Sequence, residues 1–190
     1  MSKARAKKIK LLLFDVDGVM TDGTLWFIPP ATNGAADHVD SAKLESKGFH
    51  AHDGTAMSLA RLGGLKTGLI TRRTSETVER RARDLRLDYT YQGVIVKMRV
   101  FEKVLDKERI TPAEIAYVGD DVIDLPIMRC CGFAVAVANA RDEVKQEAHW
   151  TTPHRGGEGA IRDVVEYILK AQGNWESALR SYLERGDPQK

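Results

Sequence analysis

The sequence predicts an α/β fold: a Rossmann-like, doubly wound parallel sheet in a single domain that spans residues 1–190. Three observations lead to this prediction. Short apolar runs alternate along the chain with segments of helical periodicity. Two of the runs end in clusters of aspartate, near residues 15–17 and 120–124. A chain of 190 residues, 43% of them hydrophobic, is long enough for one substantial core.

Six short apolar segments are predicted to be strands. They cover 9–14, 65–71, 88–91, 115–118, 133–137 and 149–152. Because strands that alternate with helices form parallel sheets, we expect one sheet with helices on both faces. Ligands bind such sheets at the carboxyl ends of the strands, which is where both aspartate clusters fall.

The segments between these strands have helical features. Segment 74–87 begins with good capping residues, and 100–105 and 161–169 carry apolar stripes at helical spacing. Thr111-Pro112 marks another helix or turn start. Segment 174–185 is expected to be a short amphipathic helix that seeks a partner surface.

Residues 22–50 interrupt the alternation of strands and helices. A short apolar run at 24–28 is followed by several turn-forming residues. We expect a small β-hairpin flap at about 22–50, with an irregular tip near 29–40. The segment is too small for an independent unit, so no cap domain is predicted.

Composition and charge exclude several classes of function. The net charge is +2, and five of the first ten residues are Lys or Arg, which predicts a disordered, solvated basic tail. We therefore expect neither nucleic acid nor a membrane as a partner. No apolar stretch approaches the length of a membrane span. Cys130 and Cys131 are adjacent and cannot form a disulfide framework, which fits a reduced, cytoplasmic protein.

The two acidic strand ends provide what phosphoryl transfer requires. Asp15 and Asp17 lie on one side of an extended strand tip, because side chains alternate with period two. Asp120 offers the hard oxygen ligand that Mg²⁺ prefers. Thr71 can donate a hydroxyl hydrogen bond, and Lys97 can neutralise charge. Two carboxylate tips on two strands predict one shared Mg²⁺ ion.

Four motifs in this order resemble those of the haloacid dehalogenase superfamily: D-x-D-G at 15–18, Thr71 after a strand, Lys97 before a helix and G-D-D-x-x-D at 119–124. The resemblance spans most of the chain and implies a phosphomonoesterase. It implies that Asp15 is the nucleophile and that Asp17 is the general acid and base. The remaining implied roles are Mg²⁺ ligation by Asp15, the Asp17 carbonyl and Asp120, support of the metal by Asp121 and Asp124, and phosphoryl binding by Thr71 and Lys97.

A closer resemblance is to the capless 3-deoxy-D-manno-octulosonate 8-phosphate phosphatases. It rests on the extended motif at 15–23 and on shorter motifs at 52–54, 91–93, 117–121 and 156–160. This family implies a small phosphorylated sugar acid as substrate. It also implies a homotetramer in which a flap and a C-terminal tail from neighbouring subunits help to close each site. The residues implied near the substrate are Gly18, His52, Asp53, Gly54, Arg73, Arg81 and Lys97.

Several positions depart from the family pattern. Arg72 stands where a glycine is usual, His52 replaces an arginine, and Ser58 replaces a basic residue. The flap is also longer than usual. These departures leave the core chemistry intact but bear on which sugar acid is bound.

Alternative interpretations remain open at this point. A nine-carbon keto-sugar acid 9-phosphate, or another small phosphate ester, would use the same chemistry. A phosphoaccepting module like a receiver domain also uses clustered Asp, Thr and Lys, and an inactive scaffold would result if Arg72 blocked phosphate entry.

Individual residues have alternative roles as well. Asp124 could cap the helix that contains Pro126, and Asp22 is expected to form a turn. His50 and His52 would alternate on one strand face, where a metal pair is conceivable but substrate-facing or surface histidines are favoured. The glycines at 156–159 could cradle phosphate or bring a loop close to the site.

Overall fold

The computed structural model describes residues 2–28 and 44–186. Its centre is a six-stranded parallel sheet with strand order β5-β4-β1-β6-β7-β8. All six strands predicted from the sequence are confirmed; five are slightly shorter than predicted, and β6 is one residue longer. They are β1 (Leu11–Phe14), β4 (Lys66–Ile70), β5 (Tyr89–Tyr91), β6 (Ile115–Gly119), β7 (Phe133–Ala136) and β8 (Trp150–Thr151).

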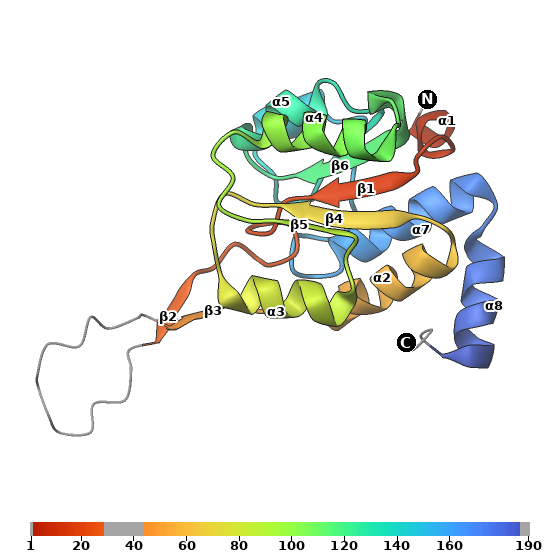
Figure 1. Cartoon of the computed structure of the whole chain (residues 1–190), viewed down its shortest axis with the longest axis horizontal. Helices are drawn as coiled ribbons and strands as arrows, with labels where there is room; N and C mark the ends of the chain where they lie inside the picture. The colour runs from red at the N-terminus through yellow and green to blue at the C-terminus, as the bar shows by residue number, and fades with distance from the viewer. Residues whose placement is uncertain (1, 29–43, 187–190) are drawn as a thin grey trace, which may run out of the picture.

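Helices cover both faces of the sheet, as expected for a doubly wound fold (Figure 1). One face carries α4 (Lys97–Glu108) and α5 (Leu125–Met128); the other carries α2 (Ala51–Leu62), α3 (Glu76–Leu85) and α7 (Ala160–Gln172). The remaining helical segments are α1 (Ser2–Ala6), α6 (Asp142–Glu147), α8 (Trp175–Arg185) and the 3₁₀ turns η1 (Pro112–Glu114) and η2 (Val122–Asp124). No separate cap domain lies within the described residues.

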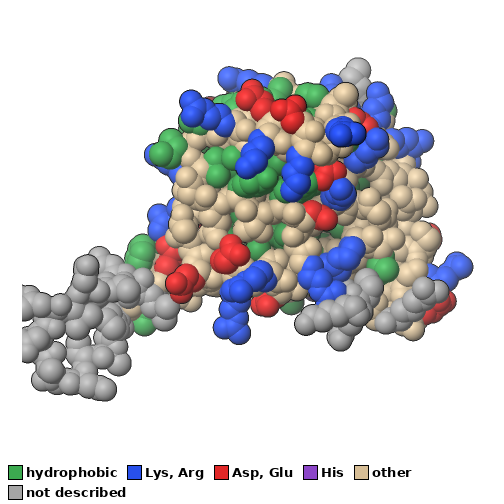
Figure 2. Space-filling model, viewed as in Figure 1, with side chains coloured by type: hydrophobic (Ala, Val, Ile, Leu, Met, Phe, Trp, Pro, Cys, Tyr) green, Lys and Arg blue, Asp and Glu red, His purple; other side chains and the backbone are tan. Residues whose placement is uncertain are grey.

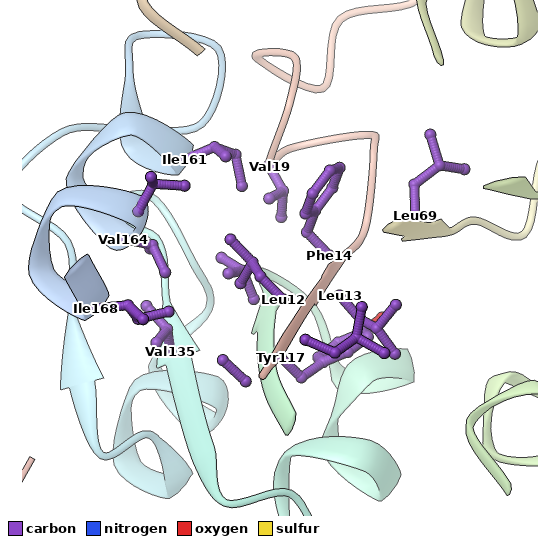
Figure 3. Packing of buried hydrophobic residues seen from close by; sticks show 14 of the residues in the cluster. Leu12, Leu13, Phe14, Val19, Leu69, Tyr117, Val135, Ile161, Val164 and Ile168 are labelled. Carbon is purple, nitrogen blue, oxygen red and sulfur yellow. The ribbon is translucent and has the colours of Figure 1, made fainter. Parts of the chain in front are cut away.

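The core is centred on β1, whose four residues are all fully buried. Because side chains alternate along a strand, Leu12 faces α7 while Leu13 shares the opposite face with its register partner Tyr117 (Figure 3). Burial on both faces explains why β1 is a continuous apolar run rather than an alternating one. It also fixes the position of the aspartates that follow it.

The predicted flap is an antiparallel hairpin of β2 (Trp26–Ile28) and β3 (Leu44–Ser46). It projects from the body of the protein near the carboxyl end of the sheet (Figure 1). The predicted irregular tip near 29–40 lies outside the described residues. Figure 2 shows apolar side chains exposed on the described part of the hairpin, where Trp26, Phe27 and Ile28 are each about half exposed or more.

Two expectations from the sequence were wrong. The basic N-terminal tail is not a disordered segment: residues 2–6 form α1, Ala6 is buried, and Arg5 Nη1 donates to the Gly132 carbonyl at 3.0 Å. His50 and His52 do not lie on a strand. His50 caps α2, with its side chain accepting from the His52 backbone N–H, and His52 lies in the first turn.

The amphipathic C-terminal segment forms α8, which packs against α2 and α7 of the same chain. The Trp175 ring lies beneath Arg162 and Lys170, at 5.3 and 5.0 Å from the ring centroid. The partner surface predicted for α8 is therefore provided, at least in part, by α2 and α7 of the same chain. Among the described residues, every helix is too short or too polar to span a bilayer.

Candidate active site

The two acidic clusters meet at the carboxyl ends of neighbouring strands. β1 pairs in parallel with β6, so that the residues following Phe14 lie beside those following Val118. Asp15, Asp120 and Asp124 each offer an oxygen, and these oxygens lie within 4.8 Å of one another. The structure thus brings the predicted acidic tips to one place, and Asp124 contributes its side chain to the cluster.

A buried lysine lies between two of these carboxylates. Lys97 Nζ is 2.9 Å from Asp15 Oδ2 and 2.8 Å from Asp124 Oδ1. The Tyr117 hydroxyl donates to the same Asp124 oxygen at 2.8 Å, and the Asp120 backbone N–H donates to the other at 3.1 Å. Asp124 makes no side-chain capping bond to α5, so its carboxylate organises the site instead.

The electrostatics of the cluster favour a cation. Burial raises the pKa of Asp15 to about 6, although Lys97 opposes the shift. Burial, reinforced by Asp124 and Asp15, raises the pKa of Asp120 to about 7. Asp120 Oδ1 is buried and has no hydrogen-bond partner in the structure. Crowded hard oxygens with one such orphan atom fit a Mg²⁺ ion, which takes oxygen ligands.

The Asp120 carboxylate lies so close to the backbone at residue 18 that only glycine fits there. The φ of Gly18 is +85°, and a Cβ there would lie 2.1 Å from Asp120 Oδ2. A side chain at this position would therefore both strain the backbone and displace the carboxylate. The chain turns sharply after Asp17 through this glycine.

A pocket of about 790 Å³ opens above the carboxylates. Thr71, Arg72, Arg73 and Asp121 line it, and Arg72 is an exposed side chain at its edge. The other residues that line it are Asp15, Asp17, Gly18, Asp22, Gly23, Thr24, Asp120, Ile123 and Asn139. Most of the predicted catalytic and metal-binding residues therefore line one cavity. Lys97 is not part of the lining but forms ion pairs with Asp15 and Asp124 beneath it.

Asn139 is a lining residue that the sequence analysis missed. Its side-chain amide donates to the Gly18 carbonyl at 3.3 Å, and its Oδ1 accepts from the Gly156 N–H at 2.6 Å. Gly156 packs so closely that a Cβ would lie 1.8 Å from the Gly18 oxygen. The glycine loop thus approaches the site, one of the two predicted possibilities. Asn139 follows strand β7, so the strand-end rule could have identified it.

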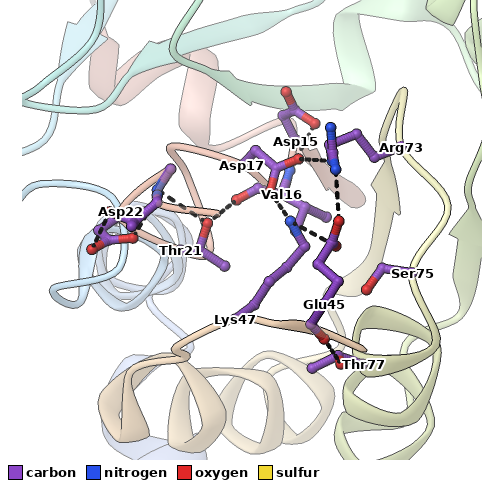
Figure 4. Close-up of polar contacts among 12 residues, drawn as sticks. Asp15, Val16, Asp17, Thr21, Asp22, Glu45, Lys47, Arg73, Ser75 and Thr77 are labelled. Carbon is purple, nitrogen blue, oxygen red and sulfur yellow. Dashed lines mark hydrogen bonds and ion pairs between the residues drawn. The ribbon is translucent and has the colours of Figure 1, made fainter. Parts of the chain in front are cut away.

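Asp17 belongs to a network of charges with the hairpin (Figure 4). Lys47 Nζ contacts Asp17 Oδ1 and lies 3.2 Å from Glu45 Oε1. Arg73 Nη2 is 2.6 Å from Glu45 Oε2. Although burial acts against it, hydrogen bonds from Arg73 and Lys47 hold the pKa of Glu45 below its ordinary value. Neither Glu45 nor Lys47 was predicted, because only the folded hairpin brings them to the site.

Five of the predicted substrate-binding residues lie outside this pocket lining: Lys97, described above, and His52, Asp53, Gly54 and Arg81. Asp53 is buried, and its Oδ1 accepts from the Arg162 N–H at 2.9 Å at the start of α7; burial raises its pKa to about 6. Arg81 lies against Gly54 with its guanidinium over the Phe49 ring. His52 lines a separate hollow beside α7.

Two other acidic residues have local structural roles. Asp22 Oδ1 accepts from the Thr24 N–H at 2.8 Å, which confirms the predicted turn. Asp121 caps η2, with Oδ1 accepting from the Val122 N–H at 2.7 Å. Asp121 also faces the pocket, so a supporting role beside a metal remains a prediction.

A doubly wound parallel sheet, with carboxylates at two adjacent strand ends and a lysine and a threonine beside them, is the arrangement of a phosphoryl-transfer enzyme. Comparisons with known proteins agree. Residues 84–164 match the family model described as haloacid dehalogenase-like hydrolase. Over 175 residues, the chain is 37% identical to the 3-deoxy-D-manno-octulosonate 8-phosphate phosphatase KdsC of Escherichia coli K12, covering 92% of this chain and 87% of the relative.

Solved structures show the same relationship. A 3-deoxy-D-manno-octulosonate 8-phosphate phosphatase from Yersinia pestis superposes with a TM-score of 0.83 at 35% identity, covering 92% of this chain and 88% of that one. The enzyme of the same name from Moraxella catarrhalis, in complex with magnesium, phosphate and KDO, gives 0.85 at 32% identity, covering 95% and 97%. The chain therefore belongs to the haloacid dehalogenase-like hydrolases, in the family of these phosphatases. This membership favours a hydrolase over the receiver-like module.

Proposed function

We propose that this protein is a Mg²⁺-dependent phosphatase that hydrolyses 3-deoxy-D-manno-octulosonate 8-phosphate, a small sugar-acid phosphate, through an aspartyl-phosphate intermediate. The observation that carries the proposal is the meeting of Asp15 with Asp120 and Lys97 at adjacent strand ends. The choice of substrate is supported by its relatives, which are named as phosphatases of this compound.

The reaction proceeds in two steps at Asp15. Its carboxylate attacks phosphorus in line, while Asp17 protonates the oxygen of the departing alcohol. Asp17 then takes a proton from water, which hydrolyses the aspartyl-phosphate. Lys97 holds Asp15 in place from below, and the Thr71 hydroxyl at the pocket wall can hold a phosphoryl oxygen.

The same residues form the metal site. Asp15, the Asp17 backbone carbonyl and Asp120 would hold Mg²⁺, and Asp121 and Asp124 would support it. When bound, Mg²⁺ offsets the repulsion between the attacking carboxylate and the anionic phosphate. The buried Asp120 oxygen that lacks a hydrogen-bond partner fits this assignment.

A homotetramer would complete the site. The pocket has no cap within the described chain, and the hairpin beside it exposes Trp26, Phe27 and Ile28. Another apolar patch, Ile95 and Val96, is exposed just before α4. Solvent-exposed apolar side chains of this kind mark association surfaces. A hairpin from a neighbouring copy could cover the pocket without a separate cap domain.

The proposal is tested by assaying phosphate release from a panel of sugar phosphates and aromatic phosphates with Mg²⁺. We expect highest kcat/KM for 3-deoxy-D-manno-octulosonate 8-phosphate. Asp15→Asn should lower kcat by at least about 10³-fold, because it removes the nucleophile. Asp106→Asn, an exposed change on α4, is the matched control and should keep wild-type activity. Turnover that survives Asp15→Asn, or is confined to aromatic phosphates, would contradict the proposal.

A further inference from the structure

The hairpin and the pocket are joined by a closed ring of four charged side chains (Figure 4). Lys47 bridges Asp17 and Glu45, and Arg73 Nη2 is 2.6 Å from Glu45. The ring closes where Arg73 Nε lies 3.7 Å from Asp17 Oδ2. Cations and carboxylates alternate around it, so its formal charge is zero.

The two cations of the ring differ in burial. The Lys47 side chain is fully buried, whereas that of Arg73 is 41% exposed. A buried ammonium is stable only while it has anionic partners, and Lys47 has two. Loss of either carboxylate would leave this buried ammonium with a single anionic partner.

Asp17, the residue that must reach the departing alcohol, has both carboxylate oxygens engaged by cations of the ring. Asp17 Oδ1 contacts Lys47, and Asp17 Oδ2 faces Arg73. A leaving oxygen that approaches Asp17 must take the place of one of these cations. Lys47 can turn from Asp17 on a flexible four-carbon stem while it keeps its contact with Glu45 at 3.2 Å. A displaced Lys47 needs a second anion to replace Asp17.

The proposed substrate carries such an anion. Its phosphate belongs with Asp15 and Lys97, and its carboxylate lies on the alcohol portion that leaves. We propose that Lys47 is a specificity-determining residue that exchanges Asp17 for the carboxylate of the sugar acid. One ion pair breaks, one forms, and Asp17 becomes free to face the leaving oxygen. This inference rests on the proposed function.

The experiment compares two substrates that differ only in this charge: 3-deoxy-D-manno-octulosonate 8-phosphate and its C1 carboxamide analogue. Both have the same phosphate and the same leaving alkoxide. The variants are Lys47→Met and Lys47→Arg. Lys66→Met is the control, because Lys66 also forms an ion pair, with Glu108, but at the opposite end of the sheet.

Wild type should prefer the acid over the amide by roughly 10- to 100-fold in kcat/KM, the value of one charge-assisted contact. Lys47→Met should abolish this preference, chiefly by raising KM for the acid more than KM for the amide. Lys47→Arg should restore much of the preference, and Lys66→Met should retain it all.

Two results would overturn the inference. An equal fall for acid and amide in Lys47→Met would show that Lys47 only holds Asp17 and the hairpin. Equal use of both substrates by wild type would show that no residue reads the carboxylate. Hydrolysis of neither substrate by wild type would overturn the proposed function itself, and the inference with it. Turnover of the amide also reports whether Lys47→Met is folded.

Discussion

The charge balance around Lys97 explains why single residues matter at this site. Asp15, Asp120 and Asp124 supply three carboxylates, and Lys97 supplies one positive charge. When all are ionised, the local charge is −2, which one divalent cation cancels. The pKa values of Asp15 and Asp120 lie well above their ordinary values because burial and mutual repulsion disfavour this charge in the metal-free protein.

Mg²⁺ should therefore stabilise the protein against heat. At a free concentration about 100 times its Kd, a ligand that binds only the folded state adds about 2.7 kcal/mol, or roughly 5–11 °C in Tm for this size of chain. Asp120→Asn should reduce this shift to about 1 °C, because it removes a ligand charge. Differential scanning fluorimetry with EDTA and with Mg²⁺ measures both values. Asp106→Asn should keep the full shift; an undiminished shift in Asp120→Asn would place the metal elsewhere.

At the scale of elements, one buried carboxylate joins α2 to α7 by a hydrogen bond. Asp53 in the first turn of α2 accepts a hydrogen bond from the Arg162 N–H in the first turn of α7. Anions at a helix N-terminus are stabilising, yet burial still raises the pKa of Asp53 from 3.8 to about 6. Ionisation of Asp53 therefore costs more free energy in the folded protein than in the unfolded chain.

This cost predicts a pH dependence of stability. Between pH 4 and 6 the folded state binds more protons at Asp53 than the unfolded state, so the free energy of unfolding falls as pH rises through this window. Asp53→Asn keeps an oxygen acceptor and removes the titration. Its stability relative to wild type should rise by about 1–3 kcal/mol from pH 4 to pH 7. Urea unfolding at several pH values measures the difference, with Asp106→Asn as reference; a difference that does not change with pH would refute the assignment.

How far the sequence predicts these elements depends on the type of signal. Strands β1, β4, β6 and β7 were predictable because they are almost entirely buried runs, whereas the edge strands β5 and β8 are only partly buried and were predicted as short apolar segments. The acidic tips followed from the strand-end rule. Helix α2 was not predicted, because Gly54 and polar residues fill its first turn and weaken its apolar periodicity. Helix α5, of four residues, was expected only as the helix that contains Pro126, and helix α6, of six residues, is too short for a periodic pattern. Lys47 and Glu45 could not be found at all, since their approach to Asp17 depends on how the hairpin folds back.

At the scale of the whole molecule, the hairpin exposes apolar side chains in a single copy. It projects from the body, and the Trp26 and Phe27 side chains are 61% and 53% exposed. The pocket beside it is open and has no cap in the described part of the chain. Both features fit an assembly in which the hairpin of each copy packs over the pocket of a neighbouring copy.

Replacing Trp26 and Phe27 together with serine should therefore weaken the assembly without unfolding the subunit. Exposed positions contribute little to the fold, so we expect a change in unfolding free energy within about 1 kcal/mol. Sedimentation velocity should show a shift toward monomer, and kcat/KM should fall with it. Leu183→Ser changes a 75% exposed side chain on α8 and tests whether the C-terminal helix, rather than the hairpin, forms the interface. An unchanged sedimentation coefficient in the double variant would remove the hairpin from the interface.

The strand order also has a consequence for synthesis of the protein. Leu11 on β1 pairs with Lys66 on one side and with Ile115 on the other, so the central strand emerges from the ribosome long before its second neighbour. Until then one edge of β1 is unpaired, which exposes the apolar segment to aggregation or capture by a chaperone. Asp15 is made early but acquires its electrostatic surroundings only after Asp124 has been translated, so nascent chains that stop short of β6 should be inert.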